Sequence, residues 1–229
     1  MPGRIGSFVI AASTALVLLG ASILPFANPV FVRFEQDRAG VGALTGYDSA
    51  ELDRVTGSIL GDLFLAQGNF NVGDTRLMPI LSDREQAHMR DVRGVFQGFF
   101  ALVIVSAVVL VWAFRRARAP EARAAAWRSV GSGARGLVFV LVVAGAFAVF
   151  AFDAAFEVFH RLFFSAGSYT FDPRTDRLVQ LFPEQFWSET AIAVGAVAIV
   201  AALLTACQAG RRARSAAPTA VLTTSRAGS

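Results

Sequence analysis

The chain has few residues that cross-link a protein or bind a metal. Its 229 residues include one cysteine, two histidines and no lysine, so all 21 basic side chains are arginine. A single cysteine excludes an internal disulfide and any metal site built on several cysteines. Without lysine, the stretch GSGARG (131–136) cannot be a phosphate-binding loop, which needs a lysine and a preceding strand. No serine lies in a glycine-flanked nucleophile turn.

Charge is also scarce, whereas apolar residues are abundant. Only 17% of residues are charged, 55% are hydrophobic, and the mean hydropathy is +0.54, which is typical of a membrane protein. Each of four apolar runs has the roughly 20 residues needed to cross a bilayer core of about 30 Å. The runs cover residues 5–26, 94–114, 136–156 and 190–209. We therefore expect an all-α membrane protein with four transmembrane helices, in which residues 1–214 form one membrane domain and 215–229 a disordered cytoplasmic tail.

The charges between the runs predict the orientation. Residues 115–135 hold six arginines and one acid, residues 27–93 hold seven arginines against ten acids, and residues 153–187 hold three against five. Basic loops remain in the cytoplasm. Both termini and the 115–135 loop should therefore face the cytoplasm, and the two acidic segments should form an extracytoplasmic cap on a bacterial cytoplasmic membrane. Since the basic charge flanks the membrane spans, we expect no nucleic-acid partner. The inner loop can form a short interfacial helix from Pro120 onward, or be only a basic loop.

Two helices are predicted within the first outer segment. Apolar residues at helical spacing, preceded by Asp48 as a cap, predict a helix near 49–66. Ser82 and Glu85 form a second capping-box pattern, and the helix that follows should run without a break into the second span.

The two histidines are predicted to lie at similar depth. Twenty residues back from Phe114 is Val95, so His88 lies roughly 10 Å outside the hydrocarbon at the rise of an α-helix. The same count over residues 137–156 places His160 roughly 6 Å outside. Both imidazoles should therefore lie on the outer face, near the lipid headgroups.

Each histidine has charged residues at helical spacing. His88 is accompanied by Arg84, Glu85 and Asp91, and His160 by Glu157 and Asp153. Asp153 lies inside an apolar stretch. An ionisable residue in such a position is costly in free energy and is usually functional.

Several interpretations of the pair remain open at this point. Each histidine can be an interfacial anchor paired with a local carboxylate, as in a membrane assembly or lipid-binding protein without enzymatic activity. The pair can also perform acid–base chemistry. Finally, both histidines end a Glu-x-x-His motif, and two such motifs with Glu35 and Glu189 would make a di-metal carboxylate site.

Two blocks of sequence resemble a known family. LSDREQAHMRDV (81–92) and FHRLFFSAGSYTFDPRTDRLVQLFPEQFW (159–187), each followed by an apolar run, are similar to a family of bacterial four-span proteins that includes the lipoprotein intramolecular transacylases, Lit. The resemblance covers roughly residues 5–207. It implies an enzyme that moves the sn-2 acyl chain of a diacylglyceryl-modified lipoprotein to the α-amine of its lipid-bearing cysteine. The family's two functional histidines match His88 and His160, and we expect membrane lipids around the site but no metal or cofactor.

The chemistry of such a transfer agrees with the residues. Moving an acyl chain from an ester to an amine needs a base and stabilisation of a tetrahedral oxyanion, and an imidazole can be the base at neutral pH. Donor and acceptor belong to one substrate, so holding them together removes the need for a covalent enzyme intermediate. We expect His160 to be the base, oriented by Glu157 or Asp153, and His88, oriented by Asp91, to act on the oxyanion. The expected helpers are Arg84, Arg161 and Tyr169.

The aromatic residues of the second block have two interpretations. They can form an interfacial aromatic belt, which alone accounts for them, or they can line an acyl-binding groove. The residues expected to contact the acyl chain are Phe163, Phe164 and Trp187.

Overall fold

Helices make up nearly all of the ordered structure. The computed structural model describes residues 3–73 and 78–217. The elements, in chain order, are α1 (Arg4–Ile23), the 3-10 helix η1 (Leu24–Phe26), α2 (Pro29–Arg38), α3 (Val41–Thr45), α4 (Ser49–Leu65), α5 (Asp83–Arg116), α6 (Pro120–Phe150), α7 (Phe152–Phe163), α8 (Arg177–Leu181) and α9 (Glu184–Ser215). Residues 218–229 of the predicted disordered tail lie outside the described residues.

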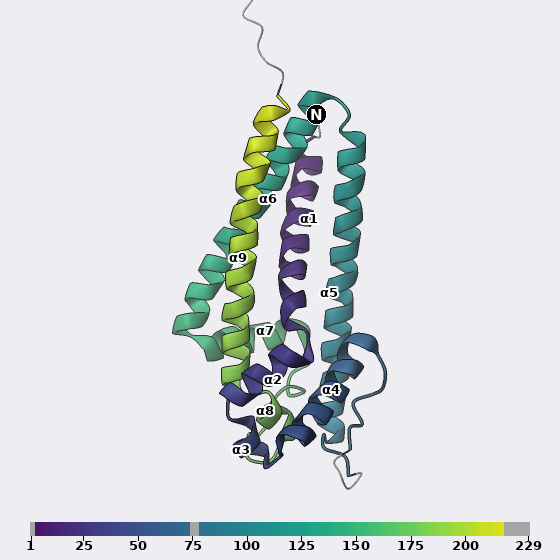
Figure 1. The fold of residues 1–229 in the computed structure, drawn as a ribbon, viewed down its shortest axis with the longest axis vertical. Coiled ribbons are helices and arrows are strands. Elements are labelled where there is room, and N and C mark those ends of the chain that lie inside the picture. The colour runs from purple at the N-terminus through teal and green to yellow at the C-terminus, as the bar shows by residue number, and fades with distance from the viewer. Residues whose placement is uncertain (1–2, 74–77, 218–229) are drawn as a thin grey trace, which may run out of the picture.

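The four long helices α1, α5, α6 and α9 run side by side as a bundle (Figure 1). Within the described residues, the segments long and apolar enough to cross a membrane are Arg4–Phe26, Asp83–Arg116, Pro120–Ala148 and Glu184–Ser215. Each of the four predicted spans therefore coincides with a helix of this length and composition, although the third ends earlier than predicted. Their apolar side chains face outward over much of α5, as expected for helices in contact with lipid tails.

Small residues join the helices of the bundle. Ala134 of α6 and Ala202 of α9 are completely buried in one apolar cluster. A side chain added at Gly133 of α6 would lie directly against the carbonyl oxygen of Ala11 in α1. Small side chains let helix backbones approach closely, which is the usual way that membrane helices pack.

Helix α6 differs from the predicted third span at both ends. The inner segment from Pro120 is neither the separate interfacial helix nor the basic loop that the sequence left open, because residues 120–135 form the first half of α6. Their alanine face is buried against the bundle while their arginines point outward. The helix also ends at Phe150, since Ala151 has φ −150° and ψ 57°, which no α-helix accommodates. The expected continuation to residue 156 is therefore wrong.

Helix α7 begins directly after this break and lies across the end of the bundle rather than along it (Figure 1). It is strongly amphipathic, and His160 is its buried residue. The depth of His160 therefore depends on the direction of α7 and not on the rise of the third span.

Four shorter helices, α2, α3, α4 and α8, gather at the end of the bundle opposite the N-terminus (Figure 1). We call them the end cap. Their apolar side chains form one core with the first turns of α5 and α9. This core consists of Val32, Val41, Leu52, Val55, Ile59, Leu63, Phe70, Val72, Ile80, Leu81, Met89, Leu178, Leu181, Phe182 and Phe186. The helix predicted near 49–66 is thus confirmed as α4, with Asp48 accepting a hydrogen bond from the Glu51 amide.

The predicted capping box at the start of α5 is also confirmed. Ser82 accepts from the Glu85 amide, and the Glu85 carboxylate accepts from the Ser82 amide. Helix α5 then runs without a break from Asp83 to Arg116. It carries His88 in its second turn, at the level of the end cap.

Candidate functional site

The two histidines of the chain lie next to each other. His88 is in the second turn of α5 and His160 is near the end of α7, and their ring centroids are 6.0 Å apart with the planes inclined by 23°. Both side chains are buried, with 6% and 8% of their surface exposed. The sequence predicted that the two histidines lie at similar depth and act on one substrate, and the fold places their imidazoles next to each other.

Aromatic rings enclose the pair. Phe164 contacts both histidines, and its ring centroid lies 4.8 Å from that of His88 and 5.4 Å from that of His160. Between ring centroids, Phe156 lies 3.9 Å and Tyr169 lies 5.0 Å from His160, while Phe171 lies 5.5 Å from His88. These rings limit the access of water to the imidazoles and strengthen electrostatic interactions within the site.

A backbone carbonyl sets the tautomer of His160. Its Nδ1 lies 2.8 Å from the carbonyl oxygen of Phe156, one helical turn earlier. A carbonyl only accepts, so Nδ1 carries the proton in the neutral ring and Nε2 keeps its lone pair. The Nδ1 of His88 is buried without a hydrogen-bond partner among the described residues.

The carboxylates that were expected to orient the rings do not do so. Asp91 and Asp153 are exposed, and in the described part of the chain neither forms a hydrogen bond with a histidine. The two carboxylates lie on exposed faces of α5 and α7, whereas both imidazoles are buried.

Glu157 forms a small network beside His160. Its Oε1 accepts from Arg161 Nε at 2.7 Å and from the Tyr169 hydroxyl at 3.2 Å. The hydrogen bond from Arg161, together with that from Tyr169, lowers the pKa of Glu157 below its usual value. An ionised carboxylate therefore holds Tyr169, whose ring packs on the His160 imidazole.

The other predicted residues lie at different distances from the pair. Arg84 lies 4.9 Å over the Phe171 ring and pairs with Asp176 at 3.0 Å, so it is separated from His88 by one aromatic ring. Phe163 is exposed and packs on Phe159.

Trp187 packs on Phe182 and Phe186 of the end-cap core, and no ring contact joins it to either histidine in the described structure. Of the three residues expected to contact an acyl chain, Phe164 alone touches the histidines. Phe171 was considered only as one of the aromatic residues of the second block that could line an acyl groove. Phe156 was not predicted as a site residue, although its four-residue spacing before His160 on one helix face could have identified it.

Glu85 is buried and its carboxylate connects parts of the fold. It is 2% exposed, its Oε1 accepts from the Leu178 amide at 2.6 Å, and its Oε2 accepts from the Ser82 amide and hydroxyl, each at 2.7 Å. Oε1 thus joins α5 to α8, while Oε2 closes the capping box of α5.

The residues of the di-metal alternative do not form one group. Glu35 and Glu189 are neighbours that share Arg38, with Arg38 Nε 3.8 Å from Glu35 Oε2 and 2.8 Å from Glu189 Oε2. Among the residues that the structure describes, no three His, Cys, Asp or Glu side chains form a group that could hold a metal. The paired Glu-x-x-His motifs therefore do not build the site that their spacing suggested.

Comparisons with known proteins agree with this architecture. A protein-family model described as "Lipoprotein intramolecular transacylase Lit" matches residues 8–187. The in meso structure of the membrane-integral lipoprotein intramolecular transacylase Lit from Bacillus cereus shares the fold, with a TM-score of 0.73 and 16% identity over 93% of this chain and 96% of that one. No protein with a curated function matches the chain by sequence.

Structures of two variants of the Bacillus cereus protein share the fold as well. The variant with a histidine-to-arginine mutation has a TM-score of 0.69 at 15% identity, over 93% of this chain and 92% of that one. The variant with a histidine-to-alanine mutation has a TM-score of 0.65 at 17% identity, over 93% of this chain and 94% of that one. The chain belongs to the Lit family of lipoprotein intramolecular transacylases, because it is a multi-pass membrane protein with this bundle and the family model matches most of its length.

Proposed function

We propose that the chain is an acyltransferase that moves the sn-2 acyl chain of a diacylglyceryl-cysteine lipoprotein to the α-amine of the same cysteine. The product is a lyso-form lipoprotein with an N-acylated terminus. The observation that carries the proposal is the buried pair of His88 and His160, whose rings lie 6.0 Å apart in an aromatic site. Membership of the family supplies the substrate class.

His160 is suited to be the general base. Its Nδ1 proton is held by the Phe156 carbonyl, so the lone pair of Nε2 can take a proton from the cysteine α-amine. As this proton leaves, the amine nitrogen bonds to the ester carbonyl carbon, giving a tetrahedral intermediate. When this collapses, the bond from carbon to the glycerol oxygen breaks, the amide remains on the cysteine, and the glycerol oxygen receives the proton.

His88 can act on the oxygens of the same intermediate. Its Nδ1 has no partner among the described residues, which leaves it available to the oxyanion or to the departing glycerol oxygen. The hydroxyl of Tyr169 donates its one proton to Glu157 in this structure, and it would become a second donor on the His160 side by turning that proton from the carboxylate to the oxyanion. Because the ester and the amine belong to one molecule, positioning them in this site supplies much of the rate.

The orientation follows from the distribution of arginine. The N-terminus and the turn between α5 and α6 lie at the end of the bundle opposite the end cap (Figure 1). This end carries the arginine-rich residues 115–135, which favour the cytoplasmic side. The end cap and the histidine pair then lie at the outer membrane–water interface, where the glycerol esters of lipoproteins are also found.

The test is the conversion of a diacylglyceryl lipoprotein in a bacterial host that lacks N-acylation, followed by mass spectrometry of the lipoprotein N-terminus. We expect His160→Ala and His88→Ala each to reduce formation of the lyso-form by about 10²–10⁴-fold, the usual contribution of an acid–base group. Arg90→Gln, an exposed change on the same helix as His88, is the control and should retain the parent rate.

Conversion at the parent rate by either histidine variant would exclude that residue from catalysis. If the parent protein forms no lyso-form product while it is folded and present in the membrane, the proposed substrate is wrong.

A further inference from the structure

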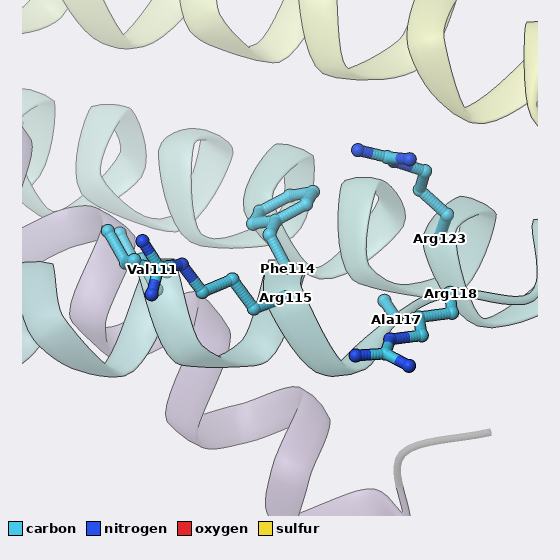
Figure 2. Close-up of a pocket in the computed structure, with 7 residues that line it drawn as sticks. Val111, Phe114, Arg115, Ala117, Arg118 and Arg123 are labelled. Carbon is cyan, nitrogen blue, oxygen red and sulfur yellow. The ribbon is translucent and has the colours of Figure 1, made fainter.

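A basic groove lies at the end of the bundle opposite the histidines. It is formed by the last turns of α5, the turn that follows and the first turn of α6, and its volume is about 550 Å³. Its lining consists of Leu110, Val111, Phe114, Arg115, Ala117, Arg118 and Arg123. In Figure 2, Arg115 extends along α5 to Val111, whereas Arg123 points upward and Arg118 downward on the other side of Phe114.

The three guanidinium groups of the groove have no carboxylate partner within the described ranges. Arginines of the end cap, by contrast, pair with acids, as Arg38 does with Glu189. The acid nearest in sequence is Glu121, which is exposed and does not line the groove. Unpaired arginine forks bind phosphate oxygens in a bidentate manner and with strong hydrogen bonds.

The start of α6 adds to the attraction for an anion. Its N-cap residue is Ala119, which cannot accept a hydrogen bond through its side chain, so the first amides of α6 have no side-chain cap. The positive end of the helix dipole of α6 thus points toward the same region as Arg118 and Arg123.

The remaining lining distinguishes a lipid from a small soluble anion. Leu110, Val111 and Phe114 form an apolar wall, and it continues along α5 into exposed apolar residues such as Val108. A free phosphate would gain nothing from this wall, whereas the acyl chains of a phospholipid would cover it.

From these observations we propose that the groove binds the phosphate of an anionic phospholipid, with the acyl chains lying along the exposed face of α5. Arg118 and Arg123 would hold the phosphate from two sides, and Arg115 would contact it or the adjoining ester from α5. The site is about a bundle length away from the histidines and does not depend on the proposed transacylase activity.

The test is native mass spectrometry of the full chain released from mixed micelles of phosphatidylglycerol and phosphatidylcholine. The Arg118→Gln/Arg123→Gln protein is compared with Arg211→Gln/Arg214→Gln, which removes the same charge from the same end of the bundle but outside the groove. We expect the parent and the control to retain phosphatidylglycerol in preference to phosphatidylcholine. The groove variant should retain it at least about tenfold more weakly, as expected for two arginines near an anionic lipid surface.

Three outcomes would overturn the proposal. Equal losses in both double variants would show attraction by net charge and no site, and equal retention of the two lipids by the parent would show no selectivity for an anionic headgroup. If inorganic phosphate at millimolar concentration displaces phosphatidylglycerol, the groove binds a free anion rather than a lipid. The unfolding temperature of each variant in phosphatidylcholine alone shows whether the protein is folded, and Arg123→Gln as a single variant repeats the comparison should the double variant not fold.

Discussion

Replacing Glu85 tests whether this residue stabilises the fold or takes part in the reaction. Its carboxylate is buried three residues before His88 and accepts from the Leu178 amide on one oxygen and from Ser82 on the other. Replacing it by alanine removes the capping box of α5 and leaves the buried Leu178 amide without an acceptor. We therefore expect Glu85→Ala to destabilise the junction between α5 and α8.

The size of the effect can be worked out from these contacts. An unsatisfied buried amide costs about 1–3 kcal/mol, and loss of a helix cap costs about 0.5–2 kcal/mol. The free energy of unfolding should thus fall by about 3 kcal/mol, which lowers the unfolding temperature by about 6–12 °C for a chain of this size. Glu85→Gln should recover only part of this loss, because an amide can face one donor with its oxygen but must meet the other with its NH₂ group.

The assay is thermal unfolding of the purified protein in detergent, with transacylase activity measured on the same samples at a temperature where each is folded. Asp91→Ala is the matched control, since it removes an exposed carboxylate from the same helix. If Glu85→Ala keeps the unfolding temperature of the parent while losing activity, Glu85 acts in the reaction and the structural role assigned to it is wrong.

Three further predictions follow from single side chains. Gly133→Ala should lower the unfolding temperature, because overpacking against Ala11 costs about 1–3 kcal/mol, whereas Gly145→Ala, with open space around it, should not; equal effects would contradict the packing. Tyr169→Phe should lower the transacylase kcat/KM at least about tenfold without changing the unfolding temperature, because it removes the hydroxyl but not the ring on His160; an unchanged kcat/KM would exclude the hydroxyl as a donor. Burial, together with the neighbouring Glu189, raises the pKa of Glu35 above 4.5, so ionising Glu35 destabilises the folded state; this penalty is absent below pH 4.5, grows up to the folded pKa and is constant above it. Glu35→Gln should therefore stabilise the protein at pH 8 but not at pH 4, and a pH-independent difference in unfolding temperature would contradict this.

Much of the fold was predictable because hydropathy and capping are local properties. The four spans, helix α4 and the capping box at Ser82 were all correctly predicted from residues close together in the sequence. The first half of α6 was not, because its arginines suggest a loop while its alanines form the buried face. Nor was the break at Ala151, which neither proline nor glycine marks.

The site was predictable in its histidines but not in the groups that hold them. An imidazole is rare in this chain, so His88 and His160 could be singled out. The group that orients His160 is a backbone carbonyl, and every residue has one, so no side chain marks it. Glu85 could not be assigned correctly either, since its partner amide is 93 residues further along the chain.

The break at Ala151 also bears on how the protein fits bilayers of different thickness. A transmembrane helix longer or shorter than the surrounding hydrocarbon adapts by tilting. If His160 were on an unbroken extension of α6, every change of tilt would carry its imidazole away from His88. Because α7 is a separate helix, packed through His160 and Phe164 on the His88 ring, α6 can adjust to the lipid around it while the two imidazoles keep their spacing.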